Sequence, residues 1–170
     1  MDTLWTAIIG AGGAITAALI PALLARQASV RNKCYDKVTA SINTPKPNEM
    51  ASRTFKCSGV VTGLQPGLSL WLAVEVNNLV WPKESKVAPD QNNKWSATVF
   101  EDGATETFAV ALFVTDSRAD RRIKKWLEAG RSTGNYSELK GIPGARRLAR
   151  VHGLRLTLTT PSDSANTLSL

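Results

Sequence analysis

The sequence contains a single histidine and only two cysteines. Zinc sites draw on cysteine and histidine at close spacings such as CxxC, and no such spacing occurs in this chain. The lone His152 also lacks the partners of a two-histidine metal site or a Ser-His-Asp triad. No GxSxG, HExxH or dinucleotide-binding motif is present. We therefore expect no catalytic residues, no metal and no cofactor, and a function other than that of an enzyme.

The two cysteines, Cys34 and Cys57, are too few for a disulfide framework. In a reducing compartment both remain thiols. In an exported domain, a single bridge between Cys34 and Cys57 is the alternative. The sequence leaves this choice open.

Acidic side chains are scarce in two segments, residues 26–57 and residues 117–155. Lysine and arginine number 21 against 14 acidic residues, which gives a net charge of +7. Residues 26–57 carry seven basic and two acidic side chains, residues 58–116 three and seven, and residues 117–155 eleven and three. A basic block predicts an anionic partner, either lipid, nucleic acid or an acidic protein, with a merely solvated surface as the alternative.

Charged side chains are missing altogether between Thr3 and Ala25. As a helix this stretch is about 34 Å long, against a hydrocarbon core of about 30 Å. It predicts a transmembrane anchor over residues 1–25, with a cleaved signal peptide or a helix buried in a soluble assembly as alternatives. Four cations follow it, so the positive-inside rule predicts a single-pass cell-membrane protein with the N-terminus outside and the C-terminal domain cytoplasmic. These cations are Arg26, Arg31, Lys33 and Lys37.

One ridge of this expected anchor helix carries only alanine and glycine. Small residues let two helix backbones approach closely in lipid, which favours their association. We therefore expect a homo-oligomer in the lipid bilayer, formed through Ala7, Gly10, Ala11, Ala14, Ala18 and Ala22.

The segment after the expected anchor is a basic linker. Apolar residues four apart allow the helix to continue through residues 26–43, and a strand over Cys34–Ile42 is the alternative. Pro45 and Pro47 then end regular structure, because proline lacks an N–H donor. The expected division is an anchor at 1–25, a linker or continuing helix at 26–49, a folded domain at 50–160 and a flexible tail at 161–170.

Apolar residues alternate with a period of two in the middle of the chain, as is typical of strands. Every second residue from Leu68 to Val76 is aliphatic, so these side chains share one face. Asn77 and Asn78 tolerate positive φ and predict a tight hairpin turn. We expect the next strand to end at Pro82, before a polar loop over residues 83–93.

Further alternation predicts strands around Phe55–Val61, Trp95–Val99, Phe108–Val114 and Leu154–Leu158. About six strands result, which suffice for a small sandwich or barrel. The expected fold is an N-terminal single transmembrane helix followed by a mainly-β domain with one inserted amphipathic helix.

The separation of Cys57 and Trp71 resembles that of the second-strand cysteine and third-strand tryptophan of immunoglobulin domains. The rhythm of turns and strands over residues 53–116 is similar as well. The later-strand cysteine of that family is missing, because Phe108–Thr115 contains none. The resemblance implies an immunoglobulin-like β-sandwich, and such a fold serves binding more often than catalysis.

A basic amphipathic helix is expected near residues 117–129. Asp116 or Ser117 is a suitable N-cap, and Gly130 is a suitable stop. The helix would cover an open end of the sandwich with its apolar stripe, which consists of Ala119, Ile123, Trp126 and Leu127. Its other face carries cations, and more arginines follow the helix in the sequence. Together they predict a site for an anion or a partner. The candidate residues are Arg118, Arg121, Arg122, Lys124, Lys125, Arg131, Arg146, Arg147 and Arg150.

Three functions are compatible with these observations. The first is a membrane-tethered, non-enzymatic recognition or signalling module that self-associates through its helix and binds a protein or an anionic ligand. The second is a membrane-disrupting effector whose Gly/Ala-rich helices assemble in the bilayer. The third is a nucleic-acid-binding protein that uses the basic region at 117–155.

Overall fold

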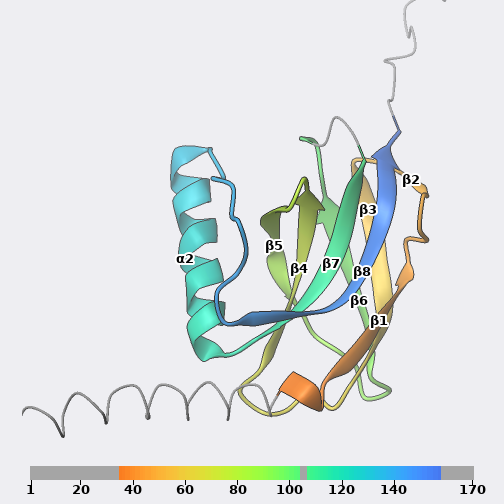
Figure 1. Ribbon diagram of the computed structural model, residues 1–170, viewed down its shortest axis with the longest axis vertical. Coiled ribbons are helices and arrows are strands. Elements are labelled where there is room, and N and C mark those ends of the chain that lie inside the picture. The colour runs from red at the N-terminus through yellow and green to blue at the C-terminus, as the bar shows by residue number, and fades with distance from the viewer. Residues whose placement is uncertain (1–34, 104–106, 158–170) are drawn as a thin grey trace, which may run out of the picture. The chain divides into compact units, whose positions relative to one another are not determined.

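The computed structural model describes residues 35–103 and 107–157 (Figure 1). The chain divides into two compact units, residues 1–37 and residues 38–170. The second unit contains all the strands and the helix described below.

Two β-sheets make up most of this unit, which confirms the expectation of a mainly-β domain. One sheet has the order β1-β3-β6 and the other the order β2-β8-β7-β4-β5. All neighbours are antiparallel except β2 and β8, which run parallel. The first sheet consists of β1 (Thr39–Thr44), β3 (Thr54–Thr62) and β6 (Lys94–Phe100). The second consists of β2 (Met50–Ala51), β4 (Ser69–Val76), β5 (Leu79–Val87), β7 (Phe108–Thr115) and β8 (Ala145–Leu156).

The apolar face predicted over Leu68–Val76 forms the sandwich interior. Leu70, Leu72 and Val74 on β4 are each 1% exposed. They pair across the ladder with aliphatic residues of β7, which are equally buried. Because side chains alternate along a strand, one whole face of β4 and β7 is removed from water. Burial of apolar surface stabilises the fold by about 25 cal/mol per Å².

The hairpin between β4 and β5 confirms the turn predicted from two asparagines. Asn77 and Asn78 have φ values of 48° and 67°, as a type I′ turn requires. Strand β5, however, does not end at Pro82 as the sequence predicted, and it continues to Val87. Proline is tolerated there because β5 is the edge strand of its sheet, where a missing N–H costs no ladder bond.

The sequence left the segment before Pro45 open between a helix and a strand. Residues Thr39–Thr44 form β1, which pairs with β3. Strand β8 begins at Ala145, so the arginine-rich segment before Val151 belongs to the sheet and not to a loop.

Helix α2 (Ser117–Thr133) is the inserted helix, and it is longer than predicted. Asp116 is the N-cap, and its Oδ1 accepts hydrogen bonds from the main-chain N–H groups of Arg118 and Ala119 at 2.9 and 2.8 Å. Gly130, the expected stop, lies inside the helix against the ring of Tyr136, where an added Cβ would collide. The helix ends at Gly134, whose φ of 69° is the left-handed conformation typical of a C-cap.

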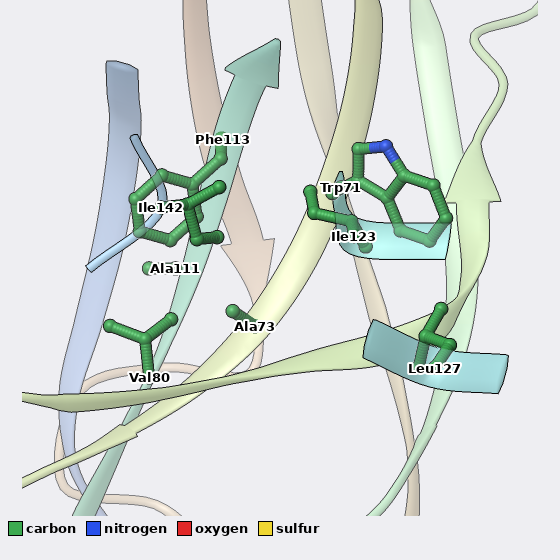
Figure 2. Packing of buried hydrophobic residues seen from close by; sticks show 8 residues of the cluster. All are labelled: Trp71, Ala73, Val80, Ala111, Phe113, Ile123, Leu127 and Ile142. Carbon is green, nitrogen blue, oxygen red and sulfur yellow. The ribbon is translucent and has the colours of Figure 1, made fainter. Parts of the chain in front are cut away.

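A second apolar cluster joins α2 to the five-stranded sheet, on the face of β4 and β7 opposite the sandwich interior (Figure 2). Ile123 and Leu127 of the helix are 1% and 3% exposed and lie beside Trp71 of β4. The expected apolar stripe of the helix is thus confirmed. Trp71 faces α2 rather than the space between the sheets, so it does not pack as the tryptophan of an immunoglobulin domain does.

The transmembrane helix expected from the sequence is corrected by the structure. Across residues 35–103 and 107–157, no helix is both long enough and apolar enough to cross a membrane. Helix α2 has 17 residues and a strongly charged face, whereas a crossing needs about 20 mainly apolar residues. The predicted single-pass membrane localisation and its orientation depended on that helix, and they are wrong for the same reason.

The expected anchor at residues 1–25 and the tail at 161–170 lie outside the described residues. The same is true of the residues predicted for helix self-association, Ala7, Gly10, Ala11, Ala14, Ala18 and Ala22.

Candidate functional site

The nine cations predicted to bind an anion fall into paired and unpaired groups. Lys124 forms an i,i+4 ion pair with Asp120 at 3.1 Å. Arg131, near the end of α2, lies 3.5 Å from the carboxylate of Glu84 on β5. Both cations are therefore partly neutralised by the fold.

Arg147 and Arg150 of β8 converge on one buried carboxylate. Nη1 of Arg147 donates to both oxygens of Glu75 at 3.0 and 3.1 Å, and Nε of Arg150 donates to Oε2 at 2.7 Å. The Glu75 side chain is 7% exposed, whereas the two guanidinium side chains are about half exposed. On the intervening strand β7, Glu75 pairs with Ala109 and Arg150 with Ala111, and these small side chains leave room for the contact. Arg147 pairs with Phe113 and reaches Glu75 diagonally.

Arg146 and Arg131 do not join this pair of arginines. Nη2 of Arg146 donates to the main-chain carbonyl of Val38 at 3.0 Å, and Arg131 is held at Glu84. These four of the predicted arginines thus lie in three separate places and do not form one anion site.

Four cations of α2 form no ion pair with any described residue. Arg118, Arg121 and Lys125 are exposed, and Arg122 donates only to the carbonyl of Pro143 at 3.2 Å. Their spacing of three and four residues puts them on one side of the helix, opposite Ile123. We call this set, Arg118, Arg121, Arg122 and Lys125, the basic stripe.

Asp120 is the polar junction beneath α2. Its Oδ1 accepts the indole N–H of Trp71 at 3.1 Å and lies 2.8 Å from Nζ of Lys86, while Oδ2 faces Lys124. Burial acts to raise the pKa of Asp120, but hydrogen bonds from Lys86, Lys124 and Trp71 outweigh it and hold the pKa below its usual value. The carboxylate therefore fixes the helix to the sheet as an anion.

A groove of about 860 Å³ lies along the free edge of β5, and the sequence did not reveal it. Four aromatic side chains from four segments line it: Trp81 of β5, Phe100 of β6, Trp126 of α2, and Tyr136. Phe100 is 57% exposed, which is unusual for so large an apolar side chain. Trp126 and Tyr136 pack as a tilted pair with ring centroids 5.3 Å apart.

Charged residues of the groove are mainly acidic. Glu101 is buried, and its Oε2 lies 2.7 Å from Nζ of Lys83, which joins the two sheets at this edge. Glu84, whose side chain is 64% exposed, accepts a hydrogen bond from the Tyr136 hydroxyl at 3.3 Å. Asp102 is exposed beside Glu101. The groove thus combines an aromatic lining with an acidic rim.

Cys57 is a free, buried thiol on β3. Burial raises its pKa from 9.0 to about 12, so the thiol stays protonated at neutral pH. Within residues 35–103 and 107–157, no three His, Cys, Asp or Glu side chains gather in a way that would hold a metal ion.

Comparison with known proteins adds no assignment. No protein-family model matches the chain, and no curated protein sequence matches it.

Proposed function

We propose that residues 38–157 form a non-enzymatic recognition module whose basic stripe binds the phosphate backbone of a nucleic acid. The observation that carries this proposal is a helix face with four neighbouring cations that have no ionic partner among the described residues. The other predicted cations of α2, Lys124 and Arg131, both have one.

The basic stripe is arranged unfavourably for folding. Residues 118 and 122, and residues 121 and 125, are like-charged pairs at i,i+4, each of which destabilises a helix by about 0.2–0.5 kcal/mol. Arg118 also lies in the first turn, where the helix dipole is positive and a cation costs roughly 0.3–1 kcal/mol. Residues that reduce stability without a folding role are typical of binding surfaces.

The composition of this face favours phosphate over an acidic protein. Protein interfaces usually place aromatic or apolar anchors at their centre. Ala129 and Ser132 continue the line of the stripe along the helix instead. The aromatic Trp126 borders the stripe, four residues after Arg122, but its ring packs against Tyr136. Arginine forks bind phosphate oxygens bidentately, and such contacts are independent of base sequence.

The module is further proposed to be an immunoglobulin-like sandwich. The strand order supports this, because β3, β4, β5, β6, β7 and β8 then take the places of strands B, C, C′, E, F and G. Helix α2 would be an insertion between strands F and G, whose connection is used for binding in this fold, and it packs on the outer face of the five-stranded sheet. The outward-facing Trp71 and the unpaired Cys57 are departures from the family.

The experiment is a fluorescence-anisotropy titration of a labelled 20-base-pair DNA duplex and of single-stranded RNA with the full-length protein. The variant R118Q/R121Q/R122Q/K125Q should lose most of the affinity at low salt and should also be more stable to urea than the wild type, since like-charge repulsion is removed. Loss of binding together with a gain in stability cannot be explained by unfolding.

Lys124→Gln is the matched control, because Lys124 adjoins Lys125 on the same helix but is already paired with Asp120. It should bind nucleic acid within about twofold of the wild type. Equal binding by the wild type and the four-residue variant would refute the proposal. Equal binding to a poly-glutamate peptide would assign the stripe to acidic proteins instead.

A further inference from the structure

The groove along β5 has no part in phosphate binding, since its rim is acidic. We propose that it binds a peptide segment of a partner protein, in which a lysine or arginine adjoins an apolar side chain. This inference does not depend on the function proposed for the basic stripe.

The aromatic lining supplies the apolar half of the site. Phe100 of β6 is more than half exposed, and Trp81 of β5 is only partly buried. Both therefore have apolar surface that a bound partner would remove from water. A pocket lined by aromatic side chains is where interfaces gain most of their binding free energy. A cation above such a ring is also attracted by its π electrons.

Charge complementarity identifies the other half of the partner. The charged residues that line the groove are three carboxylates and one ammonium group. Lys83 neutralises Glu101 inside the groove, so Glu84 and Asp102 remain at the surface. Arg131, which is outside the groove lining, forms an ion pair with Glu84 at 3.5 Å. Two cations, Lys83 and Arg131, thus stand against three carboxylates, and the site keeps an excess of one negative charge. A cationic side chain is therefore favoured here, in contrast to the basic face of α2.

The edge of β5 determines how the peptide is held. The main-chain N–H of Val80 donates to the carbonyl of Leu139 at 2.8 Å, which occupies the beginning of the free edge. Pro82 follows two residues later and has no N–H to offer, and the ladder between β4 and β5 is irregular between Trp71 and Ala73. Continuous strand addition is thus blocked, and side chains must hold the partner.

The test uses ¹⁵N-labelled full-length protein and two synthetic peptides, GKFKG as probe and GEFEG as its charge-reversed control. GKFKG should shift the amide signals of β5 and of the residues around Phe100 in a saturable way, and GEFEG should not. The variant E84Q/D102N should weaken GKFKG binding about five- to tenfold at low salt. Phe100→Ala should weaken it by a similar factor through loss of the apolar contact.

Two matched controls accompany these variants. Met50 is 56% exposed, almost as much as Phe100, but does not line the groove, so Met50→Ala should leave the affinity unchanged. Glu128→Gln removes an exposed carboxylate from α2 outside the groove and should also have no effect. Unchanged affinity in both E84Q/D102N and F100A, or saturable shifts confined to other surfaces, would overturn the proposal. Because the basic stripe is intact in these variants, nucleic-acid binding reports separately on that surface.

Discussion

The indole N–H of Trp71 donates to Oδ1 of Asp120 at 3.1 Å, across 49 positions of sequence. This bond fixes α2 to the inner strand β4, and Lys86 of the neighbouring edge strand β5 joins the same carboxylate at 2.8 Å. The helix is thereby held by one polar junction in addition to its apolar stripe. The basic stripe and the aromatic part of the groove both depend on that placement.

Replacing Asp120 with alanine should lower the free energy of unfolding by about 2–3 kcal/mol, because the buried indole N–H of Trp71 then lacks an acceptor. Asp120→Asn retains an acceptor and should cost about 1 kcal/mol. Urea denaturation followed by tryptophan fluorescence measures both. Equal losses in the two variants would contradict this role for the Trp71 hydrogen bond.

The same residue predicts a pH dependence. The pKa of Asp120 is lower in the folded protein than its ordinary value of 3.8, so its ionisation stabilises the fold above that pH and the stabilisation is lost as the pH falls below it. Between pH 5 and pH 2.5 the urea midpoint of the wild type should therefore fall more than that of Asp120→Asn. Parallel curves for the two proteins would show that this carboxylate does not contribute.

The effect of Gly130→Ala on stability should change sign when the Tyr136 ring is removed. Alanine is the better helix former by about 1 kcal/mol, yet its Cβ would collide with the Tyr136 ring. Gly130→Ala should therefore destabilise the protein by about 1–3 kcal/mol. In a Tyr136→Ala background the same change should stabilise it, and thermal unfolding of the four proteins measures the sign of each effect.

Neutralising Glu75 on β4 should cost much more stability than neutralising Glu84 on the neighbouring strand β5. Glu75→Gln removes the buried anion that accepts charge-assisted hydrogen bonds from the half-exposed Arg147 and Arg150, and should cost about 1–2 kcal/mol. Glu84→Gln, at a side chain that is 64% exposed, should cost less than about 0.5 kcal/mol. Similar urea midpoints for the two variants would show that the Glu75 cluster is not structural.

Cys57 predicts slow alkylation in the native state. Its pKa of about 12 and its burial leave almost no accessible thiolate at pH 8. In a Cys34→Ser background, iodoacetamide should label Cys57 only after unfolding, as mass spectrometry can show. The raised pKa also means that stability from this group is present below pH 9 and is lost as the pH rises toward 12.

Local patterns predicted the parts of the fold that depend on local physics. The period-two alternation of Leu70, Leu72 and Val74, the Asn77-Asn78 turn and the Asp116 cap are all confirmed. The arginine-rich start of β8 gave no strand signal, because Arg147 and Arg150 lie over the sheet only where Glu75 receives them. Such pairings join residues more than 70 positions apart, and no sequence window contains both.

The candidate surfaces were predictable to different degrees. The cations of α2 were identified from sequence, but which of them are unpaired depends on Asp120 and on tertiary neighbours such as Glu84. The groove was not identified at all, since its aromatic side chains come from separate segments. An exposed Phe100 at the end of an alternating strand was the one local signal, and alternation alone does not distinguish it from a core residue.

The most direct test of the proposed function is the salt dependence of DNA binding. If the four cations of the basic stripe each displace a counterion, the slope of log K against log salt concentration should become less negative by about 3.6 in R118Q/R121Q/R122Q/K125Q. Lys124→Gln should leave the wild-type slope almost unchanged. An identical slope in the wild type and in the four-residue variant would contradict the assignment of this face to nucleic-acid phosphates.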